Sequence, residues 1–215
     1  KDISGDAGDG EAADSANKLA KNYKNANSAV SVLTKNMRTL VSTYLGVMGA
    51  KAMFGKSDAI TSAQNKLNYV NGGNDSLSQE QMLKTYAAAQ RSRGDYLGML
   101  GNVSKTMTLA GDAFDNNVDN AIRFQEIMSK AYTVGGASAA EQASSMYQLV
   151  QALGSGILQG DELRSVREGA PIAYKEIEKF AQGIYKTEES LKDMASQGMI
   201  TSDIVVAAMM KAGKS

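Results

Sequence analysis

Glycine divides this chain into short segments whose apolar residues recur at helical spacing. The 215 residues include 21 glycines but a single proline, Pro171. Between the glycines, apolar residues lie three or four positions apart, which places them on one face of an α-helix. No segment shows the sustained alternation of a β-strand. We therefore predict an all-α fold, in which many short helices joined by glycine-rich turns form a compact domain behind a longer N-terminal amphipathic helix.

The predicted organisation has three parts: a flexible polar segment at 1–27, an amphipathic helix at 28–55 and a helical domain at 56–215. The amphipathic helix carries a heptad-like seam made of Val30, Leu33, Met37, Leu40, Tyr44 and Val47. Such a seam either supports self-association or packs on the core of its own domain. Because the chain starts at Lys1 rather than Met and stops directly after a helical pattern, we expect it to be a piece of a longer protein.

Capping patterns predict where several helices begin. Ser78 with Gln81, and Ser138 with Glu141, fit the capping box, in which each side chain bonds the other residue's backbone N–H. Single N-cap candidates follow along the chain at Asp112, Asp161 and Thr201. Pro171 suits the first position of a helix. In the helix after Ser138, the residues predicted to face inward are Ala139, Ala143, Met146, Val150 and Leu153.

The residue types present exclude several chemistries. The chain has no cysteine and no histidine, so thiolate nucleophiles, zinc–sulfur sites and Ser-His-Asp or Cys-His catalysis cannot be built from it. Lys+Arg and Asp+Glu are both 23, and this balance argues against a surface specific for nucleic acid. We predict no catalytic residues, no bound metal and no cofactor.

Three blocks of sequence, in order, resemble the tape measure domain of bacteriophage and prophage tail tape measure proteins. The central block, residues 151–172, reads QALGSGILQGDELRSVREGAPI. Its family-motif positions are Gln151, Gly160, Asp161, Glu162, Leu163, Arg164, Ser165 and Pro171. The flanking blocks are AAQRSRG at 88–94 and LKDMASQGMITSDIV at 191–205. The chain departs from the pattern at Gly169, where the family more often has a longer polar residue, and we expect this glycine to loosen the turn.

The resemblance implies a structural role rather than a reaction. Proteins of this kind pack as multimers in the lumen of the phage tail, set its length and help to deliver DNA at infection. The implied partners are other tape measure chains, tail tube and tail tip proteins, and tail chaperones in the host cytoplasm during assembly. A ruler needs a constant rise along its length. Because glycines interrupt this segment so often, we expect it to be a compact end-piece and not the ruler itself.

Three other readings of the residues remain as alternatives. Asp161 and Glu162 could be an acid pair of a lytic enzyme, although neighbouring helical residues diverge by roughly 100° and a helix-capping role is favoured. Arg91 and Arg93 could contact DNA, but cations at a helix C-terminus are the simpler interpretation. The helix over Met37–Phe54 could contact a host membrane, which would make the chain a membrane-active module.

Overall fold

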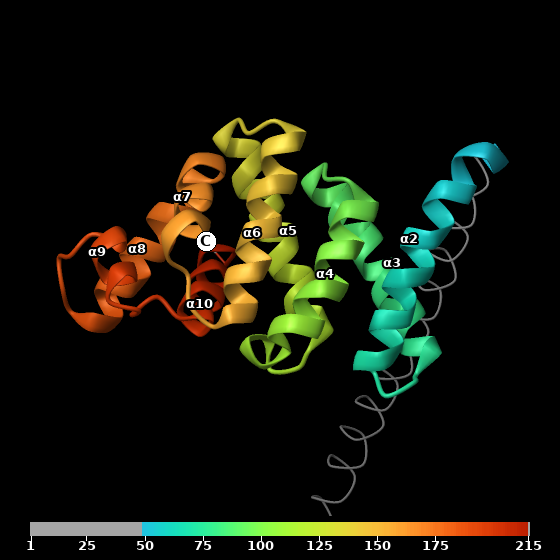
Figure 1. Cartoon of the computed structure of the whole chain (residues 1–215), viewed down its shortest axis with the longest axis horizontal. Coiled ribbons are helices and arrows are strands. Elements are labelled where there is room, and N and C mark those ends of the chain that lie inside the picture. The colour runs from blue at the N-terminus through green and yellow to red at the C-terminus, as the bar shows by residue number, and fades with distance from the viewer. Residues whose placement is uncertain (1–48, 215) are drawn as a thin grey trace, which may run out of the picture. The chain divides into compact units, whose positions relative to one another are not determined.

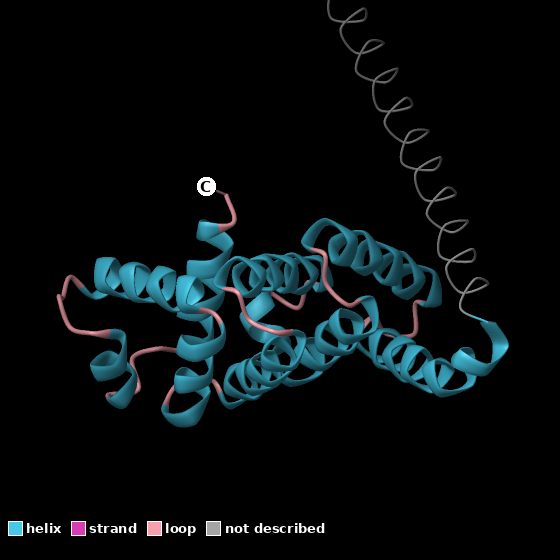
Figure 2. Ribbon diagram, turned by 90° about the horizontal axis from the view of Figure 1, so that it is seen from above, coloured by secondary structure: helices cyan, strands magenta, loops and turns pink. Residues whose placement is uncertain are grey.

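The structure is a computed structural model that describes residues 49–214, with side chains from residue 58 onward. The predicted segment at 1–27 and the seam from Val30 to Val47 lie outside the described residues. Residues 49–215 form one compact unit. Within 49–214 every regular element is a helix and no strand occurs, which confirms the all-α prediction (Figure 2). The helices are α2 (Gly49–Val70), α3 (Asp75–Ser92), α4 (Tyr96–Ala110), the 3₁₀ helix η1 (Gly111–Phe114), α5 (Val118–Gly135), α6 (Ala139–Ser155), α7 (Gly160–Gly169), α8 (Pro171–Tyr185), α9 (Leu191–Ser196) and α10 (Ser202–Ala212).

The helices of this unit follow one another from α2 at one side of Figure 1 to α9 at the other, with α4, α5 and α6 between them. Helix α2 packs on α4 and α3, α3 packs on α5, and α4 packs on α6. At the other side α6 contacts α7, and α10 contacts both α8 and α5. Short turns therefore fold the chain back on itself repeatedly, and the last helix returns to the middle of the unit.

Aromatic and aliphatic side chains from the central helices form the core. Phe114 of η1 meets Phe124 of α5 edge to face, with ring centroids 5.3 Å apart. The largest fully buried side chains come from most of the helices and from two connections: Tyr132, Phe114, Phe124, Leu67, Leu100, Met128, Leu149, Leu158, Ile177, Leu191, Met194 and Ile200. The inward face predicted for α6 is confirmed at Met146, Val150 and Leu153. It is wrong at Ala139 and Ala143, which are exposed because the first turns of α6 border an open hollow beside α4.

Some predicted helix starts are confirmed. Ser138 and Glu141 form the expected capping box at α6. Thr201 caps α10 by accepting a hydrogen bond from the backbone N–H of Ile204, and Pro171 is the first residue of α8.

Two other predicted starts are wrong. Helix α3 begins at Asp75 under the cap Asn74, so Ser78 lies inside the helix, where Asn71 donates to its hydroxyl and to Gln81. Asp112 does not cap a long helix either, because it lies in η1. Two residues in the left-handed region, Asp115 and Asn116, then break the chain before α5 begins under the cap Asn117.

Candidate functional site

The central motif block folds as the end of α6, a tight turn, and the whole of α7. Gln151 is exposed on α6, and Gly156 ends that helix in the left-handed conformation, with φ of 89°. Leu158 then enters the core at 1% exposure. Gly160, with φ of 55°, starts α7, and Leu163 is buried on its inner face. The glycines of the motif therefore make the turn that connects two helices.

The central block is bound to the third block by backbone pairing. The backbone N–H of Leu158 donates to the carbonyl of Ile200 over 2.8 Å, and the N–H of Ser202 donates to the carbonyl of Gly156 over 3.0 Å. The buried hydroxyl of Ser202 also donates to the carbonyl of Leu153 over 2.8 Å. Segments more than 40 residues apart in sequence thus close the domain together, and we call residues 156–158 and 200–202 the clasp.

Two charged motif residues of α7, Asp161 and Arg164, are exposed. The prediction that Asp161 caps this helix is wrong, because the N-cap residue of α7 is Gln159. Arg164 donates to Glu168 over 2.8 Å, and this hydrogen bond lowers the pKa of the Glu168 carboxyl. Glu162 is half-buried and Ser165 contributes its carbonyl to the interior.

Gly169 lies in a tightly packed position, and the expectation that it loosens the turn is wrong. A Cβ atom added there would lie 2.9 Å from Cβ of Ser145 and 3.2 Å from Cε1 of Tyr132. The Tyr132 hydroxyl donates to Oγ of Ser145, which in turn donates to the carbonyl of Ser165, each over 2.9 Å. Burial raises the pKa of Tyr132 to about 12. Glycine is thus needed for α7 to approach α5 and α6 closely.

The first flanking block joins α3 to α5. Arg91 donates two hydrogen bonds to Glu126 of α5, over 3.0 and 2.6 Å, and Lys130 donates a third over 2.7 Å. The Arg91 hydrogen bonds, aided by Lys130, lower the pKa of Glu126. Arg93 ends α3 in the left-handed conformation, and Gly94 follows where an added Cβ would lie 2.8 Å from Oγ of Ser129. Both arginines are exposed at the C-terminal end of α3, as the simpler interpretation predicted, and Arg91 in addition links α3 to α5 through Glu126.

A groove runs beside the clasp, between the α6 turn, η1 and the start of α10. It consists of two adjoining hollows of about 440 and 430 Å³ that share Asp112, Ala113 and Asp203. Apolar side chains that line it are Met107, Leu109, Phe114, Leu153, Val206 and Met210. Three carboxylates also line it, from Asp112, Asp115 and Asp203, and no lysine or arginine of the described chain does. We call this surface the acidic groove.

The sequence analysis missed the acidic groove. Asp112 was interpreted as a helix cap, and Asp115 and Asp203 were not considered. The run Asp115-Asn116-Asn117 is a turn signal that could have revealed the break before α5. Nothing in the local pattern could have placed Asp203 beside it, because that contact depends on the return of α10 to η1.

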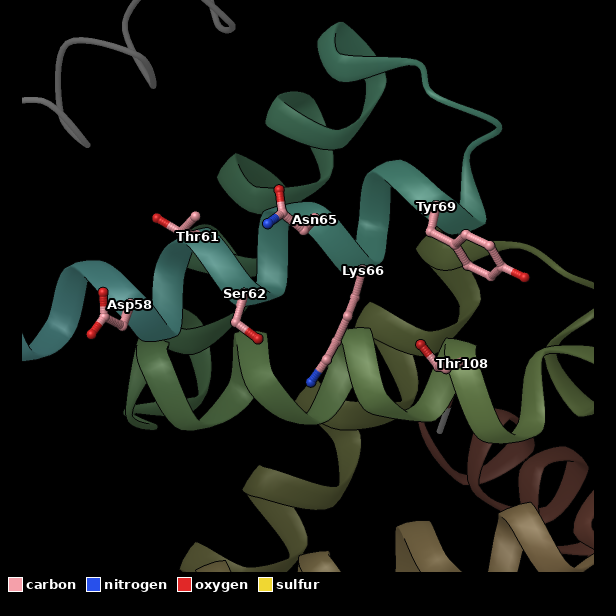
Figure 3. A pocket seen from close by; sticks show the side chains of 7 residues that line it. All are labelled: Asp58, Thr61, Ser62, Asn65, Lys66, Tyr69 and Thr108. Atoms are coloured by element: carbon pink, nitrogen blue, oxygen red, sulfur yellow. The ribbon is translucent and has the colours of Figure 1, made fainter.

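A second hollow, beside α2 and α4, is open and is lined by residues with polar side chains, chiefly from α2. Figure 3 shows Lys66 and Ser62 of α2 directed towards α4, with Tyr69 near Thr108, whereas Thr61 and Asn65 point to the other side of α2. Tyr69 is 83% exposed. The hollow gathers no convergent set of reactive groups, and it shares only Thr108 with the acidic groove.

Across the part of the chain that the structure describes, no helix combines the length and apolar character that crossing a membrane requires. The membrane interpretation of Met37–Phe54 falls largely on residues outside that part. In the same described residues, no three His, Cys, Asp or Glu side chains are grouped so that they could hold a metal ion.

Comparison with known proteins gives one match. Residues 51–215 match the family described as "Tape measure protein". This range contains all three motif blocks, the clasp and the acidic groove. No curated protein and no solved structure matches the chain. The chain belongs to the tape measure protein family, a family of structural, length-determining phage tail proteins that is not a known enzyme family.

Proposed function

We propose that this domain is a folded end-piece of a tail tape measure protein, which acts in tail assembly and DNA delivery without itself being the ruler. The clasp supports this proposal, because its hydrogen bonds join two of the family-motif blocks within one folded unit. The longest described helix, α2, has 22 residues and spans about 33 Å. Helices that fold back on one another add little length per residue, which suits an anchor or assembly nucleus.

The proposed partners follow from this role. Other tape measure chains would bind it during assembly, as would tail tube or tail tip proteins and tail chaperones. The proposed location is the tail lumen of the virion, reached from the host cytoplasm during assembly. The exposed motif positions on α7, among them Asp161 and Arg164, are available to such partners because their side chains point away from the core.

A pair of substitutions in α8 tests the need for a folded domain. Ile177 has 0% exposure, whereas Ile172 on the same helix is 41% exposed. Ile177→Asp would bury an unpaired charge, at a cost of several kcal/mol, comparable to the whole stability of a domain. In phage or prophage that encode each variant, tails would be counted by negative-stain electron microscopy and the protein level checked by immunoblot.

We expect Ile177→Asp to abolish normal tails and Ile172→Asp to leave their number and length unchanged. Normal tails with Ile177→Asp, in a sample where circular dichroism shows the purified variant to be unfolded, would refute the proposal. Loss of tails with both variants would instead indicate that the outer surface of α8 is also required.

A further inference from the structure

The acidic groove has the form of a docking site for a helix. Phe114, Leu153 and Val206 lie beneath its floor at 1, 3 and 7% exposure, so the apolar surface open to a partner comes from Leu109, Ala113, Ala207 and Met210. Gly156 forms part of the rim, and no atom lies within 4 Å of an added Cβ there, which leaves room for another backbone to approach; Gly154 instead packs against Leu109 of α4. Leu109 remains 47% exposed at the edge, although the residues around it pack closely. Amphipathic helices commonly bind in such apolar grooves through residues at i, i+3 or i+4, and i+7.

The carboxylates of Asp112, Asp115 and Asp203 give the groove a negative charge. Asp112 accepts a hydrogen bond from the Asn116 amide over 2.9 Å, but this partner is neutral. None of the salt bridges formed within residues 58–214 involves Asp112, Asp115 or Asp203. The left-handed backbone at Asp115 and Asn116 holds this edge in a conformation that few residues adopt. A partner with apolar and basic groups would fit this surface.

The chain itself contains a segment of that chemistry. Residues 15–48 hold no Asp or Glu, and their basic residues are Lys18, Lys21, Lys24, Lys35 and Arg38. The same residues contain the heptad-like seam from Val30 to Val47, whose spacing of three and four matches the anchors of a groove-bound helix. We call residues 15–48 the basic segment.

We propose that the acidic groove of one chain binds the basic segment of a second copy. Such a contact is heterologous, because groove and segment are different surfaces. Each chain that binds at its groove still offers its own basic segment, so the contact propagates from copy to copy. The inference rests on the proposed role in assembly, and it specifies how tape measure chains join one another. Charge attraction across the contact would be screened by salt.

The experiment uses the purified full chain and two variants. The groove variant carries Asp112→Asn, Asp115→Asn and Asp203→Asn. The segment variant carries Lys35→Glu and Arg38→Glu. A control with the same change of charge carries Asp58→Asn, Glu80→Gln and Glu188→Gln, three exposed positions outside both the groove and the family motif. Circular dichroism checks that each variant is folded, and sedimentation velocity at several concentrations measures the association.

We expect the wild-type chain and the control to form multimers that grow with concentration, and each site variant to bind itself at least about tenfold more weakly. In an equimolar mixture, the intact basic segment of the groove variant should bind the intact groove of the segment variant. The resulting dimer should not grow further, because its remaining groove and its remaining segment are both mutated. Raising the salt concentration should dissociate the wild-type multimers.

Three results would overturn the proposal: a wild-type chain that is monomeric at every concentration, a folded groove variant that associates as the wild type does, or a variant mixture that stays monomeric. A monomeric wild-type chain would leave the tail-assembly result with Ile177→Asp intact. Failure of this inference can therefore be told apart from failure of the proposed function.

Discussion

Substitution of Gly169 by alanine tests the packing at the end of the motif. Gly169 closes α7 without the positive φ that would demand glycine. Helix propensity alone therefore predicts that alanine stabilises the domain by about 0.5–1 kcal/mol. The added Cβ would lie 2.9 Å from Cβ of Ser145 and 3.0 Å from its Oγ, so one of these elements must move. Overpacking of this kind costs about 1–3 kcal/mol.

The expected net effect of Gly169→Ala is a loss of about 0.5–2 kcal/mol, opposite in sign to the propensity. Gly101→Ala is the matched control, because Gly101 lies on the exposed side of α4 with no atom within 4 Å of an added Cβ. That variant should gain about 0.5–1 kcal/mol. Urea unfolding followed by circular dichroism measures both. Equal stabilisation by the two alanines would refute the argument that Gly169 is needed for close packing.

Three further predictions concern hydrogen bonds that join distant elements. Ser202→Ala removes the bond to Leu153 in the clasp and should cost about 1 kcal/mol in urea unfolding, unless the carbonyl finds another donor. The hydrogen bonds from Arg91 lower the pKa of Glu126 below its ordinary 4.5, so the ionised carboxylate stabilises the fold above pH 4.5 and this stabilisation is lost as the pH falls further. Glu126→Gln should therefore weaken the loss of unfolding free energy with falling pH, as measured by urea unfolding at a series of acidic pH values. Burial raises the pKa of Tyr132 from 10.0 to about 12, so the stabilisation from its neutral hydroxyl is lost as the pH rises between these values. Tyr132→Phe should remove this part of the fall in unfolding free energy at high pH.

Local sequence patterns were sufficient for the helical fold and for several of its turns. The spacing of apolar residues predicted the buried positions Met146, Val150 and Leu153 of α6, and the capping box at Ser138 was confirmed in full. Patterns failed where a side chain had a tertiary partner. Ser78 and Gln81 fit a capping box in sequence, but Asn71 engages both from the preceding turn.

The candidate site was predicted only in part, because it depends on contacts between distant segments. The motif blocks were recognised in order, yet their spacing does not indicate that Leu158 pairs with Ile200. Gly169 illustrates the same limit, since a glycine in a turn suggests looseness until Ser145 and Tyr132 are found against it. The acidic groove could not be predicted from local patterns, because it forms only where α10 returns to contact η1.

Tail length tests most directly whether this domain is a folded end-piece and not the ruler. A helical insert of about 42 residues would be placed between Glu188 and Glu189, in the exposed connection from α8 to α9. As part of a ruler, the insert would lengthen the tail by about 63 Å, at 1.5 Å per residue. Electron microscopy of tails from phage or prophage that encode the insert should show the wild-type length. Tails longer by the helical rise of the insert would contradict the account.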